Sequence, residues 1–278
     1  MSRPAFKDSK TAFVILAWNS EAYIEKCLRS ALSLDCRELE VWCVNNGSED
    51  GTAQILAKIA AEDSHLRILT EEKNLGTTIP RNKVLSRIAA NTDYVCILDS
   101  DTVVNQAAFE TMAEALADET IGVVGPTMSN SDGVVQLSGR ALPTLGIKLG
   151  KACPFGDVAQ KAAEAERPQA PVKEGLQDVG YLLSACWLFP RTTLCRVGQL
   201  DEAIFYAPED VDWCLRCHNE GLRVVRCHEA HIIHEYQRIG HKKLLSKTNV
   251  EHIKGLAHHF KKHEYLFKAP EHNHEENQ

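Results

Sequence analysis

The sequence lacks the features of a membrane-spanning, an exported or a nucleic-acid-binding protein. It contains no run of about 18 apolar residues, so we expect no transmembrane segment. Residues 1–10 carry no apolar core of the kind that a secretory signal peptide requires, which favours a cytoplasmic location. The net charge is -7, and this acidic balance provides no positive field that would attract DNA or RNA.

Aromatic residues are sparse, at 6%, but the rest of the composition is that of a globular protein. Of the 278 residues, 44% are hydrophobic and 25% are charged, which excludes a disordered or fibrous chain. Ten cysteines are present, and most lie in apolar stretches such as 41–44 and 94–98, where a thiol acts as a small hydrophobe. Since no export signal is seen, we expect these thiols to be reduced.

Short apolar runs alternate with segments of helical spacing in the first half of the chain. The predicted strands cover residues 11–16, 39–44, 66–69, 94–98 and 121–125. The predicted helices cover about 20–32, 53–60, 81–90 and 106–116. This alternation is typical of an α/β fold with a mainly parallel central sheet flanked by helices.

The pattern weakens beyond residue 125. We predict a hairpin over 131–137, an apolar segment over 180–190, a helix over 209–220, strands over 223–227 and 231–234, and a helix over 244–267. Residues 146–177 show no clear periodicity, and we expect a variable, partly mobile excursion there. The predicted organisation is one domain over 1–240, with halves 11–125 and 126–240, followed by a C-terminal helix and polar tail over 241–278.

Polar clusters follow three of the predicted strands. They are residues 18–20, 45–50 and 99–101, each directly after an apolar run. In open parallel sheets, ligands bind beyond the carboxyl ends of the strands. Because all three clusters lie at strand ends, they indicate a ligand site at that edge of the sheet.

The Asp99-Ser100-Asp101 motif ends the predicted strand 94–98. Residues two apart on an extended segment point to the same side, so both carboxylates can face one ligand. Two such carboxylates repel each other unless a cation or a proton lies between them, and a hard divalent ion suits them. The alternative is a turn with two solvated aspartates, and an Asp-x-Asp motif alone does not decide between the two.

Glu209 and Asp210 begin the predicted helix 209–220. Acidic side chains are favourable in the first turn of a helix, and this alone would explain the pair. The alternative is a catalytic carboxylate that takes a proton from a hydroxyl group.

A cluster of cysteines and histidines raises the separate possibility of a zinc site. Its members are Cys214, Cys217, His218, Cys227, His228, His231 and His234. Because Cys214 and Cys217 fall inside a predicted helix and no second cysteine pair follows on a loop, we do not favour this interpretation.

Several blocks of the sequence occur together in a known order and spacing. They are residues 13–20, 44–52, 74–76, 81–82, 98–102, 205–216 and 232–234, which read FVILAWNS, VNNGSEDGT, NLG, RN, LDSDT, FYAPEDVDWCLR and IIH. This arrangement resembles the inverting glycosyltransferases of glycosyltransferase family 2, including its rhamnosyltransferase-like members. The resemblance implies a glycosyltransferase A-type fold, with the nucleotide held by the first half and the acceptor by the second.

The resemblance also implies roles for individual residues. The nucleotide-sugar-binding residues would be Asn19, Asn45, Asn46, Asp50, Asn74, Gly76, Arg81, Asp99 and Ser100. Asp99, Asp101 and His234 would hold a divalent cation, Mn²⁺ or Mg²⁺, and Asp210 would be the general base, with Glu209 as the second candidate. The family usually has an acidic residue at the position of Asn45, so the identity of the nucleotide base stays open.

By this resemblance the protein is an enzyme of the hexosyltransferase class, which moves a sugar from a nucleoside-diphosphate sugar to an acceptor hydroxyl. The implied acceptor is a glycan or a lipid-linked sugar of cell-surface polysaccharide biosynthesis, reached in the cytoplasm or at the inner face of the membrane. A nucleotidylyltransferase is an alternative, although the glycine-rich loop expected after the first strand is absent from residues 16–20. A catalytically inactive homologue is another.

Overall fold

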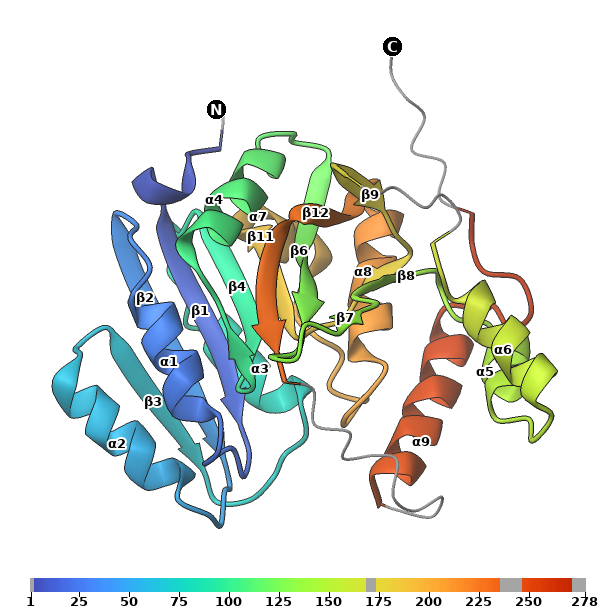
Figure 1. Ribbon diagram of the computed structural model, residues 1–278, viewed down its shortest axis with the longest axis horizontal. Coiled ribbons are helices and arrows are strands. Elements are labelled where there is room, and N and C mark those ends of the chain that lie inside the picture. The colour runs from blue at the N-terminus through green and yellow to red at the C-terminus, as the bar shows by residue number, and fades with distance from the viewer. Residues whose placement is uncertain (1–2, 169–173, 236–246, 272–278) are drawn as a thin grey trace.

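A mixed sheet of ten strands forms the centre of the molecule, in the order β3-β2-β1-β4-β11-β6-β12-β5, with β7 beside β6 and β9 beside β12 (Figure 1). The computed structural model describes residues 3–168, 174–235 and 247–271. The longer strands are β1 (Lys10–Ala17), β2 (Glu38–Asn46), β3 (Leu66–Glu71), β4 (Tyr94–Asp99), β6 (Ile121–Ser129), β11 (Cys186–Pro190) and β12 (Arg223–His234). The short ones are β5 (Thr102–Val103), β7 (Val135–Gln136) and β9 (Leu176–Asp178), while β8 (Gly139–Arg140) and β10 (Tyr181–Leu182) pair separately.

The strand directions confirm the predicted mainly parallel sheet flanked by helices. β1 pairs in parallel with β2 and β4, β2 pairs in parallel with β3, and β12 pairs in parallel with β6. The exception at the centre is β11, which runs antiparallel to β4 and to β6 and so joins the two parallel parts. The sheet is therefore mixed.

Alternate residues of β1 face opposite cores. Phe13 and Ile15 pack with α1 (Ile24–Leu32), α2 (Thr52–Glu62) and α4 (Gln106–Ala115) on one face. Ala12 and Val14 pack on the other face with α3 (Thr78–Leu85), α7 (Arg191–Val197) and α8 (Glu209–Asn219). This is the two-residue period of a strand that is buried on both sides.

Helix α3 begins at Thr78 and ends at Leu85, earlier than the predicted 81–90. Pro80 lies in its first turn, where a residue without an N–H group is tolerated because the first backbone donors of a helix have no partner within it. Arg81 therefore lies inside the helix, and its side chain is 1% exposed. The expectation that Arg81 opens a helix was wrong by one turn.

Residues 146–177 contain more regular structure than the sequence indicated. α5 (Leu145–Lys151) and α6 (Gly156–Ala165) form a helical pair beside α9 (Lys247–Lys262), at the opposite end of the molecule from α2 (Figure 1). α5 has seven residues, α6 has ten, and neither has a fully buried residue, so each offered only a short periodic pattern by which to predict it. The first residues of the predicted helix 244–267 lie outside the described part of the chain.

The predicted strands 223–227 and 231–234 are one strand, β12, with an irregular register between Cys227 and His231. The helix predicted over 209–220 is confirmed as α8. Trp187 belongs to the core, because it is fully buried and stacks on Trp213 with ring centroids 5.1 Å apart.

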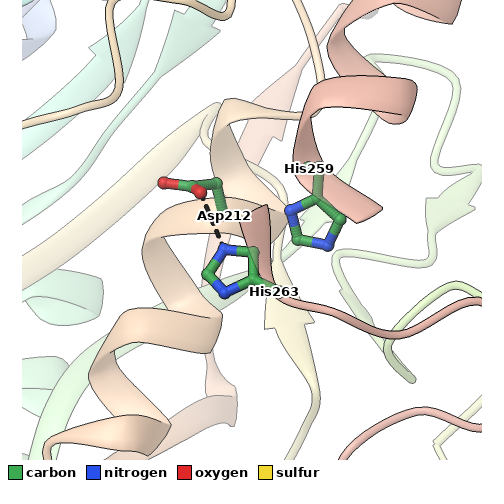
Figure 2. A group of neighbouring side chains, drawn as sticks. All are labelled: Asp212, His259 and His263. Carbon is green, nitrogen blue, oxygen red and sulfur yellow. Dashed lines mark hydrogen bonds and ion pairs between the residues drawn. The ribbon is translucent and has the colours of Figure 1, made fainter. Parts of the chain in front are cut away.

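A buried charge cluster fixes α9 to α8 (Figure 2). Asp212, which is fully buried, accepts hydrogen bonds at Oδ1 from His263 at 2.8 Å and from Lys262 at 2.7 Å, and at Oδ2 from Arg216 at 2.9 Å. The Nδ1 atom of the neighbouring His259 has no hydrogen-bond partner in the described residues. Although Asp212, His259 and His263 offer metal-ligand atoms within 4.8 Å of one another, the Lys262 ammonium already neutralises the oxygen that an ion would need. We therefore interpret the cluster as a structural ion-pair network.

The structure does not assemble the cysteine and histidine cluster into a zinc site. Cys214 and Cys217 are in the core on one face of the sheet, and Cys227 is in the core on the other. All ten cysteines are free thiols. In the three described ranges, no helix combines the length and the apolar composition that a membrane crossing requires.

Candidate active site

The carboxyl ends of β1 and β4 border a cavity of about 280 Å³. Its walls also include the start of α8, the end of β12 and residues 183–185. The cavity brings together the predicted residues Arg81, Asp99, Ser100, Asp101, Glu209, Asp210 and His234, which are up to 153 positions apart in the sequence. Their convergence follows from the sheet order, because β4 lies centrally and β12 pairs with β5 just after the Asp99-Ser100-Asp101 motif.

Asp99, Asp101 and His234 form a set of possible metal ligands. One ligand atom from each lies within 4.8 Å of the other two, and His234 Nε2 is 3.4 Å from Asp101 Oδ1. The pairing of His234 with Thr102 in the sheet positions the imidazole beside the motif. Two carboxylates and one imidazole are a donor set that suits Mn²⁺, and the two oxygens also suit Mg²⁺.

Gln136 fixes the tautomer of His234. The Gln136 amide donates from Nε2 to the His234 carbonyl at 2.7 Å, which places its Oε1 2.8 Å from His234 Nδ1. Because Oε1 is only an acceptor, Nδ1 carries the proton and donates it. In the neutral imidazole, Nε2 then presents its lone pair toward Asp101, as a metal-ligating histidine does when a second group holds its other nitrogen.

Arg81 connects the two groups of carboxylates. Its Nη2 is 2.5 Å from Asp99 Oδ1, and its Nη1 is 3.3 Å from Glu209 Oε1. Ser184 donates a second hydrogen bond to Glu209 Oε1 at 3.0 Å. The guanidinium is buried, so these are not surface ion pairs.

Burial and crowding of like charges raise the pKa values of these acids. Burial and the neighbouring Asp210 raise the pKa of Glu209 to about 8, although Arg81 opposes the shift. Burial also raises the pKa of Asp210 above its ordinary value. Asp99 has a raised pKa because burial and the charge of Asp101 outweigh Arg81. Acids with such shifts are characteristic of functional sites.

The pKa of His234 is shifted upward as well. Burial lowers it, but in the charged imidazolium Nε2 also carries a proton, and its hydrogen bond to Asp101 together with the charges of Asp101 and Asp99 outweighs burial. The imidazole thus lies in a strongly negative environment, which also favours a bound cation.

Six predicted nucleotide-sugar-binding residues are not among the described residues that line this cavity: Asn19, Asn45, Asn46, Asp50, Asn74 and Gly76. Asn45 and Asn46 end β2, the other four lie in adjoining loops, and the asparagine and aspartate side chains bond to nearby backbone groups. Asn46 donates to the Gly76 carbonyl at 2.9 Å, and Asp50 accepts from the Thr52 amide at 3.0 Å. These bonds shape the loops beside the cavity, while nucleotide contact by these residues stays a prediction.

Several residues that the sequence analysis did not select also belong to this site. Trp18, Ser184 and Tyr206 line the cavity, and Gln136 supports His234. Trp18 is 43% exposed, and its place in the cluster that follows the first strand was the available signal. The position of Gln136 depends on the pairing of the short strand β7 with β6, the strand that also pairs with β12, and no local sequence pattern relates Gln136 to His234.

Comparison with known proteins agrees with this geometry. The Glycosyl transferase family 2 model matches residues 12–159, which is more than half of the chain. The chain belongs to glycosyl transferase family 2. It is therefore a glycosyltransferase, and this assignment displaces the nucleotidylyltransferase alternative.

Three relatives illustrate the range of the family. The N-acetylglucosaminyl-diphospho-decaprenol L-rhamnosyltransferase of Mycobacterium tuberculosis is 25% identical over 94% of this chain and 84% of its own length. Glycosyltransferase GlyA of Streptococcus pneumoniae is 30% identical over 40% of this chain, which spans only 16% of GlyA. The poly-beta-1,6-N-acetyl-D-glucosamine synthase of Staphylococcus aureus is 30% identical over 44% of this chain and 30% of its own length.

Solved structures share the fold. One is the mannosyltransferase PcManGT from Pyrobaculum calidifontis, in complex with GDP-Man and Mn²⁺. Its superposition covers 97% of this chain and 68% of the PcManGT chain, with 18% identity and a TM-score of 0.62. TarS of S. aureus in complex with UDP-GlcNAc covers 84% of this chain and 60% of its own, with 20% identity and a TM-score of 0.55. These similarities confirm the glycosyltransferase A-type fold.

Proposed function

We propose that this protein transfers a sugar, with inversion, from a nucleoside-diphosphate sugar to an acceptor hydroxyl, and that Asp99, Asp101 and His234 hold a divalent cation. One observation carries the proposal: a metal-ligand set and a pair of acids with raised pKa values line the same cavity. The Mn²⁺ in the PcManGT complex supports a divalent cation in general.

Asp210 is the proposed general base. Glu209 is 5% exposed and is held by Arg81 and Ser184, so its oxygen is committed to these partners. Asp210 is less buried, and its raised pKa brings its basicity closer to neutral pH. Glu209 is then a positioning residue for Arg81.

In the proposed reaction, the acceptor oxygen forms a bond to the anomeric carbon while its proton passes to the Asp210 carboxylate. The bond between the anomeric carbon and the diphosphate oxygen breaks, and the electron pair leaves with the nucleoside diphosphate. A divalent cation at Asp99, Asp101 and His234 would supply positive charge for that leaving group. Arg81 holds Asp99 in place from the buried side.

The acceptor is a lipid-linked or glycan acceptor of cell-surface polysaccharide assembly, which the protein meets in the cytoplasm at the inner face of the membrane. The relative aligned over most of the chain is named for a sugar-diphospho-decaprenol acceptor, which supports this choice. A catalytically inactive homologue is disfavoured because Asp99, Asp101, Asp210 and His234 are all in place.

The test is the release of nucleoside diphosphate from a panel of sugar nucleotides with an acceptor mixture and Mn²⁺ or Mg²⁺. Asp210→Asn should lower kcat by about 10² to 10⁴-fold and leave the donor KM unchanged, because only the proton acceptor is removed. Asp132→Asn, an exposed change outside the cavity, is the matched control. A wild-type protein that neither binds nor turns over any donor would contradict the proposal, and a large rise in donor KM for Asp210→Asn would contradict the role of Asp210.

A further inference from the structure

A second and larger cavity, of about 1280 Å³, lies between α5 and α9. We call it the α5–α9 groove. Its walls are largely apolar and include Leu149, Ile253 and Phe260. Leu149 is 61% exposed and Ile253 is 65% exposed, so these side chains are available to a ligand. A concave apolar surface of this kind marks a binding site.

The groove adjoins the proposed active site. Gly255 of α9 lies directly on the loop that leads into α8, so a Cβ atom there would be 2.2 Å from the Ala207 carbonyl oxygen. Ala207 is itself part of the active-site wall. Gly255 does not itself line the groove, so α9 and this loop lie between the groove and the cavity that contains Asp210.

A cluster of cations lies at the junction of the groove and the active site. Glu166, whose side chain is 2% exposed, pairs with Arg140 at 3.3 Å and with Lys148 at 2.9 Å, and it also pairs with Lys151. Three cations on one carboxylate leave an excess of two positive charges. Lys148 lines the groove, and the charges of Lys148 and Arg140 act on Asp210.

We propose that the α5–α9 groove holds the apolar chain of a lipid-linked acceptor and that Arg140, Lys148 and Lys151 bind the acceptor's diphosphate. This inference rests on the proposed function, since it supplies the binding site for the acceptor class named there. A diphosphate esterified at both ends carries about two negative charges, which matches the excess charge of the cluster. The sugar beyond the diphosphate would then face Asp210.

The observations favour a single lipid-linked molecule, and not the surface of a bilayer, as the partner of the groove. The cations are partly covered, with side-chain exposures of 27% for Arg140 and 22% for Lys148, and they converge on one point. A bilayer surface would instead be met by fully exposed lysines spread over a helix face.

The test uses the full chain and three probes: geranylgeranyl diphosphate, inorganic diphosphate and geranylgeraniol. Binding of each is measured by calorimetry below the critical micelle concentration, and donor binding is measured in parallel. Ile253→Asp changes the groove, while Val250→Asp changes the same helix outside the groove at a residue that is 40% exposed. Lys148→Met removes one cation and leaves Glu166 with two partners, and urea unfolding checks that each variant is folded.

We expect geranylgeranyl diphosphate to bind at least about tenfold more tightly than either partial probe, because it uses both the apolar wall and the cations. Ile253→Asp should weaken it at least about tenfold, since a buried charge replaces an apolar contact. Val250→Asp should have no effect. Lys148→Met should weaken both diphosphates, and donor binding should stay unchanged in every variant.

Other outcomes overturn the inference. If the donor binds but geranylgeranyl diphosphate does not, or if it binds equally to Ile253→Asp, the groove is not the acceptor site, although the proposed function stands. Suppose that the wild type sediments with phosphatidylglycerol vesicles, that Ile253→Asp does not, and that geranylgeranyl diphosphate does not bind. The groove then faces a membrane instead. Failure of the wild type to bind any sugar nucleotide would instead count against the proposed function itself.

Discussion

The buried carboxyl group of Glu209 makes the stability of the protein depend on pH. Its pKa lies at about 8, against an ordinary value of 4.5, because burial and Asp210 disfavour the charged form. Between pH 4.5 and about pH 8, the Glu209 carboxyl therefore keeps its proton in the folded state and has lost it in the unfolded state. The stability that this proton provides is complete below about pH 4.5 and is lost as the pH rises through about 8.

The magnitude follows from the size of the shift. One proton of difference corresponds to about 1.4 kcal/mol of unfolding free energy per pH unit, so the Glu209 contribution falls by about 3 kcal/mol between pH 5 and pH 7.5. Glu209→Gln keeps the shape and the Ser184 hydrogen bond but cannot ionise. We expect its unfolding free energy to decline less steeply over this range than that of the wild type.

Urea unfolding at half-unit steps from pH 5 to pH 9 measures the two slopes. The slope of Glu209→Gln is compared with that of the wild type, because Asp99, Asp210 and His234 are present in both proteins and contribute to both slopes. Glu220→Gln, an exposed change at the other end of α8, is the matched control and should follow the wild type. Parallel curves for the wild type and Glu209→Gln would refute the assignment of a protonated, buried Glu209.

Three further changes test other contacts. Gln136→Met removes the acceptor for His234 Nδ1 and should weaken Mn²⁺ binding about 10 to 100-fold, as measured by electron paramagnetic resonance, with little change in the urea midpoint. Gly255→Ala places a methyl group 2.2 Å from the Ala207 carbonyl and should lower the unfolding free energy by about 1–3 kcal/mol, a loss that a wild-type urea midpoint would contradict. Asp212→Asn weakens the buried network of α8 and α9 and should cost about 3–5 kcal/mol by the same measurement, whereas a loss below about 1 kcal/mol would mean that the network is not stabilising.

The sequence was sufficient to place the motif at the end of a strand. Residues 94–98 are apolar throughout and Asp99 follows, so a buried central strand with a polar carboxyl end was the consistent interpretation. The convergence of Asp210 and His234 on that end came from the family resemblance, since Asp210 follows Asp101 by 109 positions and no local pattern spans that distance.

Two parts of the molecule could not be predicted from local pattern. The inward position of Arg81 depends on where α3 begins, and Pro80 was compatible with a start on either side of it. The helices α5 and α6 are only seven and ten residues long and bury no side chain fully, so the apolar pattern by which a helix is recognised is short in both. The groove that α5 forms with α9 therefore became visible only in three dimensions.

The central strand β11 is also the last strand to complete the middle of the sheet. Residues 186–190 lie between β4 and β6, although β4 ends at Asp99 and β6 ends at Ser129. During synthesis, the edges of β4 and β6 that pair with β11 stay unpaired while about 60 residues after β6 are added. Unpaired strand edges of this kind promote aggregation. A fragment that stops at residue 159, where the family match ends, would keep both edges open and lack Asp210 and His234. The sheet can thus be completed only late in synthesis, once β11 and then β12 have been added.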